Sequence, residues 1–399
     1  MGQERWWEIE LKRTYSYGRH SIGEDDIEAV TGTLKGDWLT QGPKVQEFEK
    51  ALGVKFGSKR ATVVCNGTAA LHLCGLALGW QRGDIVITSP ITFLATANCI
   101  VYAGATPDFV DIDGLSYTLD LNRLEEKLKR YHESGKKVKA VIGVDFAGHP
   151  CDWHALREMA DKYDFQLVND ACHAMGAELS GDQTYGAKYA DLVVFSFHPV
   201  KHITTGEGGA ILTNRIQYDD IIRVLRTHGM VKENTTLEKN DGPWYYEMHS
   251  LGFNYRITDL QCALGLSQLS RLNVFVRKRR QLAQLYDELL SNDERFNIPN
   301  VRHDCSHAFH LYPLLVEFDQ IGKNKKDFFH QLKGQGINVQ VHYIPVHLQP
   351  FYRKNYGFQI GDFPAAEEFY RKEVSIPMYP DLGQEDLNYI ADNIKLYLK

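Results

Sequence analysis

The sequence is poor in cysteine and has no long apolar run. Its seven cysteines, in 399 residues, follow neither the spacing of a disulfide framework nor that of a CxxC metal knuckle. Most of them lie within or beside apolar stretches. We therefore expect reduced core cysteines in a cytoplasmic protein.

The sequence also does not indicate a surface that binds a membrane or nucleic acid. No apolar run approaches the roughly 20 residues of a membrane span. The opening MGQERWWEIELKRTYSYGRH is too charged for a signal peptide. Lysine and arginine number 45 against 51 aspartates and glutamates, a net charge of -6, whereas nucleic-acid binding needs a clustered positive excess. The sequence thus predicts an intracellular protein that binds neither membrane nor nucleic acid.

Short apolar runs alternate with helical patterns over the first two thirds of the chain. This alternation predicts a parallel sheet with helices on both faces. In such sheets the ligand-binding and catalytic residues lie at the carboxyl ends of the strands. We expect strands at 60–65, 84–88, 106–111, 139–145, 165–169 and 192–196, with helices after residue 66 and at 93–103.

The pattern of apolar and charged residues changes near residue 267. A charged helical stretch at 269–291 precedes strands at 312–318 and 336–343 and helices at 325–335 and 385–398. A chain of this length allows two or three structural units, or one fold of two unequal lobes. From the change of pattern we expect an N-terminal arm (1–20), a large α/β domain (21–268) and a small α+β domain (269–399).

One lysine stands out in the stretch FSFHPVKHITTGEGGAILTN. Lys201 follows an expected strand, and glycines give the backbone after it wide latitude. Such a lysine could form a Schiff base with an aldehyde and then carry a proton. The alternative is a surface lysine in a glycine turn.

The stretch NDACHAMG places Asp170 at the end of an expected buried strand. A carboxylate there is costly unless it faces a cation, and a protonated pyridine nitrogen is such a cation. His173 lies close enough to share the surroundings of that ring. The alternative is a helix N-cap aspartate with a satisfied histidine.

The stretch NGTAAL opens an expected helix directly after a strand, so Gly67 and Thr68 could bind a phosphate. Ser196 could add a hydroxyl, and Phe93 could offer a flat face, although a Gly-Thr helix start is common and Phe93 could be a core residue. Together these groups fit one ligand, pyridoxal 5′-phosphate (PLP).

A metal site is the competing interpretation of HDCSHAFH, at 303–310. The spacing of its three histidines and one cysteine matches no finger pattern, and an expected strand follows at once. We interpret it as incidental clustering and predict no metal.

The sequence resembles the DegT/DnrJ/EryC1/StrS sugar aminotransferases from about Tyr17 to its end. The resemblance is carried by WLTQGPKVQEFEKAL, NGTAALHL, SPITFLATAN, DFAGHPCD, NDACHAMGAE, FSFHPVKHITTGEGGA, GFNYRITDLQCALGLSQL and VHYIPVHLQPFYR. It implies the fold type I architecture of aspartate aminotransferase, with a large, mostly parallel sheet domain and a small C-terminal α+β domain. Three of the motifs are most similar to the branch of UDP-4-amino-4,6-dideoxy-N-acetyl-β-L-altrosamine transaminases of pseudaminic acid biosynthesis.

The resemblance also implies roles for single residues. Lys201 matches the Schiff-base lysine, Asp170 the partner of the pyridine nitrogen, and Gly67, Thr68 and Ser196 the phosphate site. His173 matches a position beside the ring hydroxyl, and Asn254 an asparagine that reaches the cofactor phosphate of the neighbouring subunit, which implies a homodimer with shared active sites. The positions that match residues near the nucleotide sugar are Tyr17, Asp37, Trp38, Leu39, Thr40, His342 and Tyr343. Arg256 could meet the diphosphate by its charge, or be a solvated arginine.

The implied reaction is the transfer of an amino group from L-glutamate to a UDP-linked 4-keto-6-deoxy-N-acetylhexosamine. Another nucleotide-linked keto sugar, of the UDP-gluco or dTDP type, remains an alternative acceptor. A PLP-dependent sugar dehydratase is a second alternative, although dehydratases of this type carry histidine where this chain has Lys201. A ligand-binding sensor is the remote third.

Overall fold

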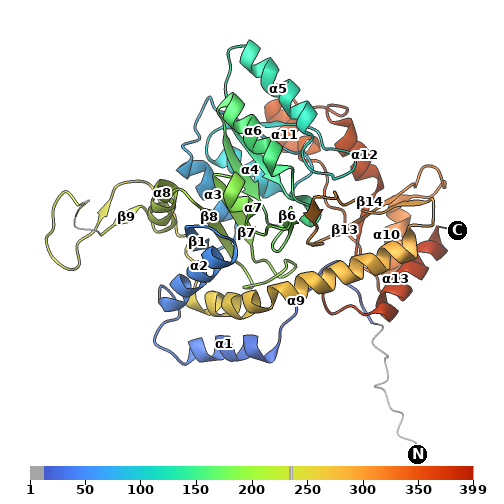
Figure 1. Cartoon of the computed structure of the whole chain (residues 1–399), viewed down its shortest axis with the longest axis horizontal. Coiled ribbons are helices and arrows are strands. Elements are labelled where there is room, and N and C mark those ends of the chain that lie inside the picture. Colours follow the sequence, from blue (N-terminus) through green and yellow to red (C-terminus); the bar gives the residue numbers. More distant parts are fainter. Residues whose placement is uncertain (1–12, 233–234, 236, 399) are drawn as a thin grey trace, which may run out of the picture.

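The computed structural model describes residues 13–232, 235 and 237–398. Its centre is a seven-stranded sheet in the order β1-β8-β7-β5-β4-β2-β3 (Figure 1). Strands β2, β3, β4, β5 and β7 pair in parallel, and β8 runs antiparallel to both β7 and β1. The mostly parallel sheet predicted from the sequence is therefore confirmed. The strands are β1 (Arg60–Val64), β2 (Ile85–Thr88), β3 (Thr106–Phe109), β4 (Val138–Val144), β5 (Gln166–Asp170), β7 (Leu192–Ser196) and β8 (Gly209–Thr213).

Helices cover both faces of this sheet. Neighbouring strand residues point to opposite faces, so Val193 packs into one apolar cluster and Val194 into another. The first cluster takes side chains from α2 (Pro43–Lys55), α6 (Trp153–Tyr163) and α9 (Asp259–Leu290). The second takes them from α3 (Gly67–Ala77), α4 (Leu94–Tyr102) and α8 (Ile216–Arg226). Because both faces are buried, the strands are short continuous apolar runs, which is why the sequence indicated them.

The long helix α9 (Asp259–Leu290) runs beneath the sheet toward the C-terminal part of the chain (Figure 1). It begins ten residues before the predicted start at 269. A capping box marks this start, because the Thr258 hydroxyl accepts from the Gln261 N–H and the Gln261 side chain accepts from the Thr258 N–H. The helix α1 (Glu24–Leu34) packs along its first half.

A three-stranded antiparallel sheet in the order β11-β13-β14 lies at the far end of α9. Residues 336–343, predicted as a strand, form only isolated bridges, Ile337 with Tyr15 and Gln340 with Ser375, so that prediction is wrong. The division of the chain into domains at residue 268 stays a prediction, and most of the predicted arm at 1–20 lies outside the described residues. The elements of this region are β11 (Phe296–Asn297), β13 (Tyr312–Val316), α10 (Lys325–Gly334), α11 (Pro350–Tyr356), α12 (Pro364–Lys372), β14 (Glu373–Ile376) and α13 (Gln384–Tyr397).

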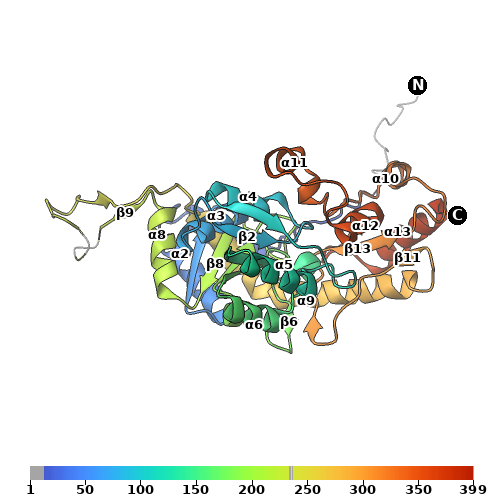
Figure 2. The ribbon, with the colours of Figure 1, turned by 90° about the horizontal axis from the view of Figure 1, so that it is seen from above.

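The remaining elements are short, and one pair projects from the body. Strands β9 (Met230–Val231) and β10 (Glu247–Met248) form a hairpin that extends away from the sheet (Figure 2). All seven cysteines are free thiols. Within the described residues, no helix combines the length and the apolar character needed to cross a bilayer. The other elements are α5 (Leu121–Glu133), β6 (Glu178–Leu179), α7 (Tyr185–Tyr189) and β12 (Cys305–Ser306).

The contact between α2 and α9 depends on the absence of a side chain at Gly265. A Cβ there would lie 2.6 Å from the Cζ of Phe48 and 2.9 Å from the Cγ2 of Thr205. We expect Gly265→Ala to lower the free energy of unfolding by about 1–3 kcal/mol, because neither neighbour can move without disturbing the core. Gly32 in α1 is the matched control, since a Cβ there meets no atom within 4 Å.

Helix propensity alone predicts that Gly32→Ala raises the free energy of unfolding by up to about 1 kcal/mol. Urea unfolding of the two variants and the wild-type protein measures both changes. An equal effect of the two substitutions would show that the α2–α9 contact is not tight.

Candidate active site

A cavity of about 690 Å³ opens at the carboxyl edge of the sheet. It is reached by the segments that follow β1, β5 and β7, as expected for a parallel α/β sheet. Residues far apart in the sequence therefore meet in one place. The predicted site residues that line it are Tyr17, Gly67, Thr68, Phe93, Asp170, His173, Ser196, Lys201, His342 and Tyr343.

The start of α3 forms an anion cradle at one end of this cavity. Asn66 caps the helix, because its side chain accepts from the Ala69 N–H at 2.8 Å. The first N–H groups of a helix have no partner within it and form the positive end of the helix dipole. A Cβ on Gly67 would lie 3.0 Å from the Cβ of Ser196, so glycine is what leaves this space open.

Gly209 in β8 lets the strand approach the start of α3. A Cβ at this position would lie 2.7 Å from the carbonyl carbon of Asn66 and 2.8 Å from the nitrogen of Gly67. No side chain fits there, so β8 fixes the position of the cradle against the sheet.

Asp170 ends β5 with its side chain almost fully buried. Its Oδ2 accepts from the Thr96 hydroxyl at 2.6 Å, and its Oδ1 accepts from the Cys172 N–H at 3.2 Å. Among the described residues no lysine, arginine or histidine forms an ion pair with it. The N-cap alternative is wrong, since no α-helix begins between β5 and β6. A buried carboxylate without a cation is costly, and a cationic ligand group would offset that cost.

His173 is held as a neutral imidazole of known tautomer. Burial lowers its pKa well below the ordinary value. The Ala147 N–H donates to Nδ1 at 3.3 Å, so the ring proton is on Nε2 and donates to the Tyr343 hydroxyl oxygen, 3.1 Å away. The hydrogen of that hydroxyl is then free for a ligand.

The amine of Lys201 lies inside the cavity, which excludes the alternative of a surface lysine. Its Nζ is 3.5 Å from the Nε2 of His310. Burial lowers its pKa, and the nearby Cys172 and Asp170 oppose the shift only in part. A lowered pKa increases the fraction of the amine that is neutral and nucleophilic.

Phe93 is 56% exposed, so the alternative of core packing is wrong. It precedes α4 and lies on the cavity wall with its ring 6.0 Å from the ring of Tyr343. Tyr17 faces the same space, 5.0 Å from the ring of His342.

Other predicted residues lie outside this cavity. Thr40 bridges to Thr258, the residue before α9, and Asn254 bridges to Thr227, the residue after α8. Arg256 lines a separate cavity of about 210 Å³ with Arg223 and Arg226. The residues in this group are Asp37, Trp38, Leu39, Thr40, Asn254 and Arg256, all but Arg256 being exposed.

Two residues of the site were missed from the sequence. Thr96 is buried and donates to Asp170, and a threonine inside the apolar run SPITFLATAN was the available signal. His310 touches Lys201, but in the sequence it belonged to the HDCSHAFH cluster.

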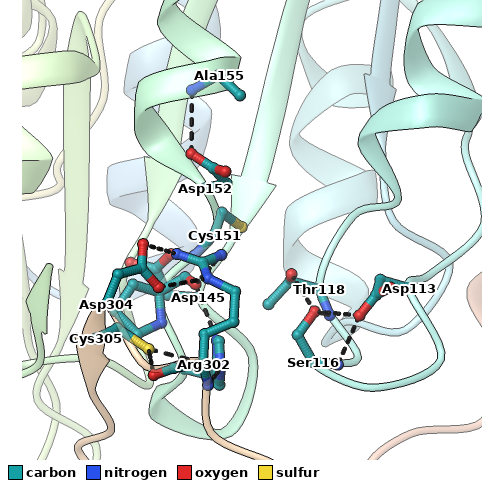
Figure 3. A network of polar contacts seen from close by, with 12 residues as sticks. Asp113, Ser116, Thr118, Asp145, Cys151, Asp152, Ala155, Arg302, Asp304 and Cys305 are labelled. Carbon is teal, nitrogen blue, oxygen red and sulfur yellow. Dashed lines mark hydrogen bonds and ion pairs between the residues drawn. The ribbon is translucent and has the colours of Figure 1, made fainter.

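The HDCSHAFH segment, at 303–310, takes part in a network of polar contacts. Cys305 contacts the His149 Nε2 at 3.6 Å and the Arg302 carbonyl at 3.4 Å, and Arg302 pairs with Asp304 (Figure 3). Within the described part of the chain, no three His, Cys, Asp or Glu side chains are grouped to hold a metal ion.

A mostly parallel sheet that presents a desolvated amine, a buried acid and an anion cradle at one edge is typical of enzymes that use PLP. Comparison with known proteins agrees with this class. The profile of the DegT/DnrJ/EryC1/StrS aminotransferase family matches residues 20–395. The chain belongs to this family and has its fold type I architecture.

Two relatives are each 38% identical to the chain. One is the UDP-4-amino-4,6-dideoxy-N-acetyl-β-L-altrosamine transaminase of Campylobacter jejuni, over 95% of this chain and 96% of the relative. The other is the spore coat polysaccharide biosynthesis protein SpsC of Bacillus subtilis, over 96% and 97%.

Solved structures show the same fold. PseC of Helicobacter pylori, an aminotransferase of pseudaminic acid biosynthesis, superposes with a TM-score of 0.87 at 30% identity, over 96% of this chain and 99% of that one. A sugar aminotransferase of Streptococcus pneumoniae (27% identity, TM-score 0.86, 97% and 99% covered) is known in a PLP form. The chain is therefore a PLP-dependent sugar aminotransferase.

The cavity fits PLP in this chain. The space that a Cβ on Gly67 would fill suits a phosphate, the buried carboxylate of Asp170 suits a protonated ring nitrogen, and the amine of Lys201 suits an aldehyde.

The hydroxyls of Thr68 and Ser196 are expected to contribute to phosphate binding. Thr68→Val and Ser196→Ala should each weaken PLP binding about tenfold or more, since a hydrogen bond to a charged group is lost. Absorbance titration of the apo-protein measures the affinity. Ser291→Ala, at the exposed end of α9, is the control and should bind as the wild type does. Unchanged affinity in both site variants would place the phosphate elsewhere.

Proposed function

We propose that the protein transfers the amino group of L-glutamate to a UDP-linked 4-keto-6-deoxy-N-acetylhexosamine, the precursor of the L-altrosamine sugar, and gives the 4-amino sugar. The observation that carries the proposal is the desolvated amine of Lys201 in the same cavity as the buried Asp170. The names of the Campylobacter and Helicobacter relatives support the sugar. Such a reaction on a nucleotide sugar belongs in the cytoplasm.

Lys201 would hold the aldehyde of PLP covalently. When released, its amine would take the proton from the donor Cα and return it to the cofactor carbon, as a general base and then a general acid. Asp170 would keep the ring nitrogen protonated. Bound PLP supplies the electron sink for the charge that develops at Cα.

The neutral side chains of the cavity would bind the uncharged parts of the ligands. His173 and Tyr343 would lie beside the ring hydroxyl, because the hydrogen of the Tyr343 hydroxyl is free. Tyr17, Phe93 and His342 would line the path of the sugar.

Two identical subunits would complete each site. The segment at 37–40 bridges to the start of α9 and Asn254 bridges to the end of α8, and none of the residues 37–40, 254 and 256 lines the cavity of its own chain. We place Asn254 at the cofactor phosphate of the partner subunit and Asp37, Trp38, Leu39 and Thr40 near its nucleotide sugar. Arg256 would be close enough to that surface to meet the diphosphate.

Lys201→Ala should lower amino transfer at least about a hundredfold, since it removes the proton carrier. Purified protein is supplied with L-glutamate and epimeric UDP-4-keto-6-deoxy sugars, and NMR of the aminated carbon identifies the product. Lys188→Ala is the control, because Lys188 is an exposed lysine. Near wild-type transfer by the Lys201 variant would remove this residue from the mechanism, and no product from any epimer would reject the proposed acceptor.

Sharing of sites predicts complementation between two defective subunits. In a mixed dimer of Lys201→Ala and Asn254→Ala chains, one site combines both defects and the other has neither. We expect each mixed dimer to have about half of the activity of a wild-type dimer, because one of its two sites has all its groups. Activity no higher than the sum of the two parent homodimers would contradict a shared site.

A further inference from the structure

A chain of three buried polar side chains ends at the cavity wall. Glu373 and Ser375 in β14 are both fully buried, and His342 is 6% exposed. The Ser375 hydroxyl donates to the Glu373 Oε1 at 2.5 Å, and the His342 Nδ1 lies 2.8 Å from the Ser375 Oγ. The second carboxylate oxygen of Glu373 accepts from the backbone N–H of His342 at 2.9 Å.

This geometry assigns the hydrogens along the chain. When Glu373 is ionised its carboxylate only accepts, so the single hydrogen of Ser375 goes to Glu373. Ser375 then offers only a lone pair to His342, and the imidazole must carry its hydrogen on Nδ1. Nε2 therefore carries the lone pair.

His342 stays neutral in this setting. Burial is the main cause that lowers its pKa to about 3. Among the described residues nothing bonds to its Nε2, and the side chain lines the cavity between Tyr17 and Tyr343. A neutral acceptor at this place suits an O–H or N–H group and not the oxygens of a phosphate.

We propose that Glu373 and Ser375 are positioning residues that fix His342 as a hydrogen-bond acceptor for an O–H or N–H group on the sugar ring of the substrate. The choice of the sugar rests on the proposed function; the assignment of the tautomer does not.

Glu373→Gln tests the polarity of the chain with almost no change in shape. The oxygen of the glutamine side chain must accept from the backbone N–H of His342. Its NH₂ group then faces the Ser375 hydroxyl. The Ser375 hydrogen then turns to Nδ1, and the His342 hydrogen moves to Nε2. The substitution therefore converts the acceptor into a donor.

The tautomer is read from imidazole ¹⁵N shifts in holoenzyme labelled at histidine, with His342→Gln used to identify the signal. Burial raises the pKa of Glu373 to about 7, so the spectra are recorded at about pH 9, where the carboxylate is ionised. We expect hydrogen on Nδ1 in the wild type and on Nε2 in Glu373→Gln. Hydrogen on Nε2 in the wild type, or no change in the variant, would overturn the proposal.

Kinetics locate the contact on the ligand. In Glu373→Gln we expect the KM for the UDP-sugar to rise about tenfold, as for the loss of one hydrogen bond, while the Kd of UDP alone and the half-reaction with the amino donor change less than about twofold. Ser375→Ala, which breaks the chain without reversing it, should raise KM to a smaller extent. An unchanged KM, or an equal loss of UDP affinity, would reject the contact with the sugar.

The two proposals fail in different ways. If the wild-type enzyme turns over no UDP-4-keto sugar, the proposed acceptor is wrong, while the ¹⁵N spectra still decide the tautomer. If Glu373→Gln unfolds, the Ser375→Ala variant decides, because a wild-type His342 spectrum in it would overturn the relay.

Discussion

The site depends on a buried carboxylate that the chain itself leaves without a counter-charge. Asp170 receives two hydrogen bonds but no ion pair among the described residues, at the carboxyl end of the central strand β5. Burying such a group lowers stability unless a ligand brings a positive charge. In a PLP enzyme that charge is the protonated ring nitrogen, so folding and cofactor binding favour each other.

The sheet brings the remaining groups to this carboxylate. Parallel strands deliver their following segments to one edge, and so residues near 67, 170 and 201 face the same cavity. Lys201 loses water there and its pKa falls, while the carboxylate of Asp170 accepts hydrogen bonds from Thr96 and Cys172. The same burial thus gives one group nucleophilic character and leaves the other as the partner of a cation.

The sequence predicted the parts of this arrangement that depend on local pattern. Short apolar runs located the strands, and the residues after them included Thr68, Asp170 and Lys201. The start of α9 was missed because an apolar stretch before residue 269 does not show charged helical periodicity, although the capping box at Thr258 was present. Residues 336–343 have the composition of a strand, but they pair with neighbours only at single positions.

Contacts between distant segments were not predictable from spacing. His310 and Lys201 are 109 positions apart, and Thr96 and Asp170 are 74 apart. The segments at 37–40 and 254–256 carry family motifs, yet they lie outside the cavity of their own chain. The spacing of motifs along the sequence therefore does not say which of them line the same cavity.

The buried histidines of the cavity differ in what their neighbours leave for a ligand. Burial lowers the pKa of His173 and His342, so neither contributes positive charge, and Lys201 is the amine of the site. A backbone N–H fixes His173 as a donor to Tyr343, whereas Ser375, bonded to Glu373, fixes His342 as an acceptor. Two identical imidazoles therefore present opposite hydrogen-bonding patterns, because buried hydrogens are assigned by the groups behind them. The hydroxyl and amide groups of a sugar are uncharged hydrogen-bond donors and acceptors. Their recognition therefore depends on which side chains of the cavity donate and which accept, more than on charge.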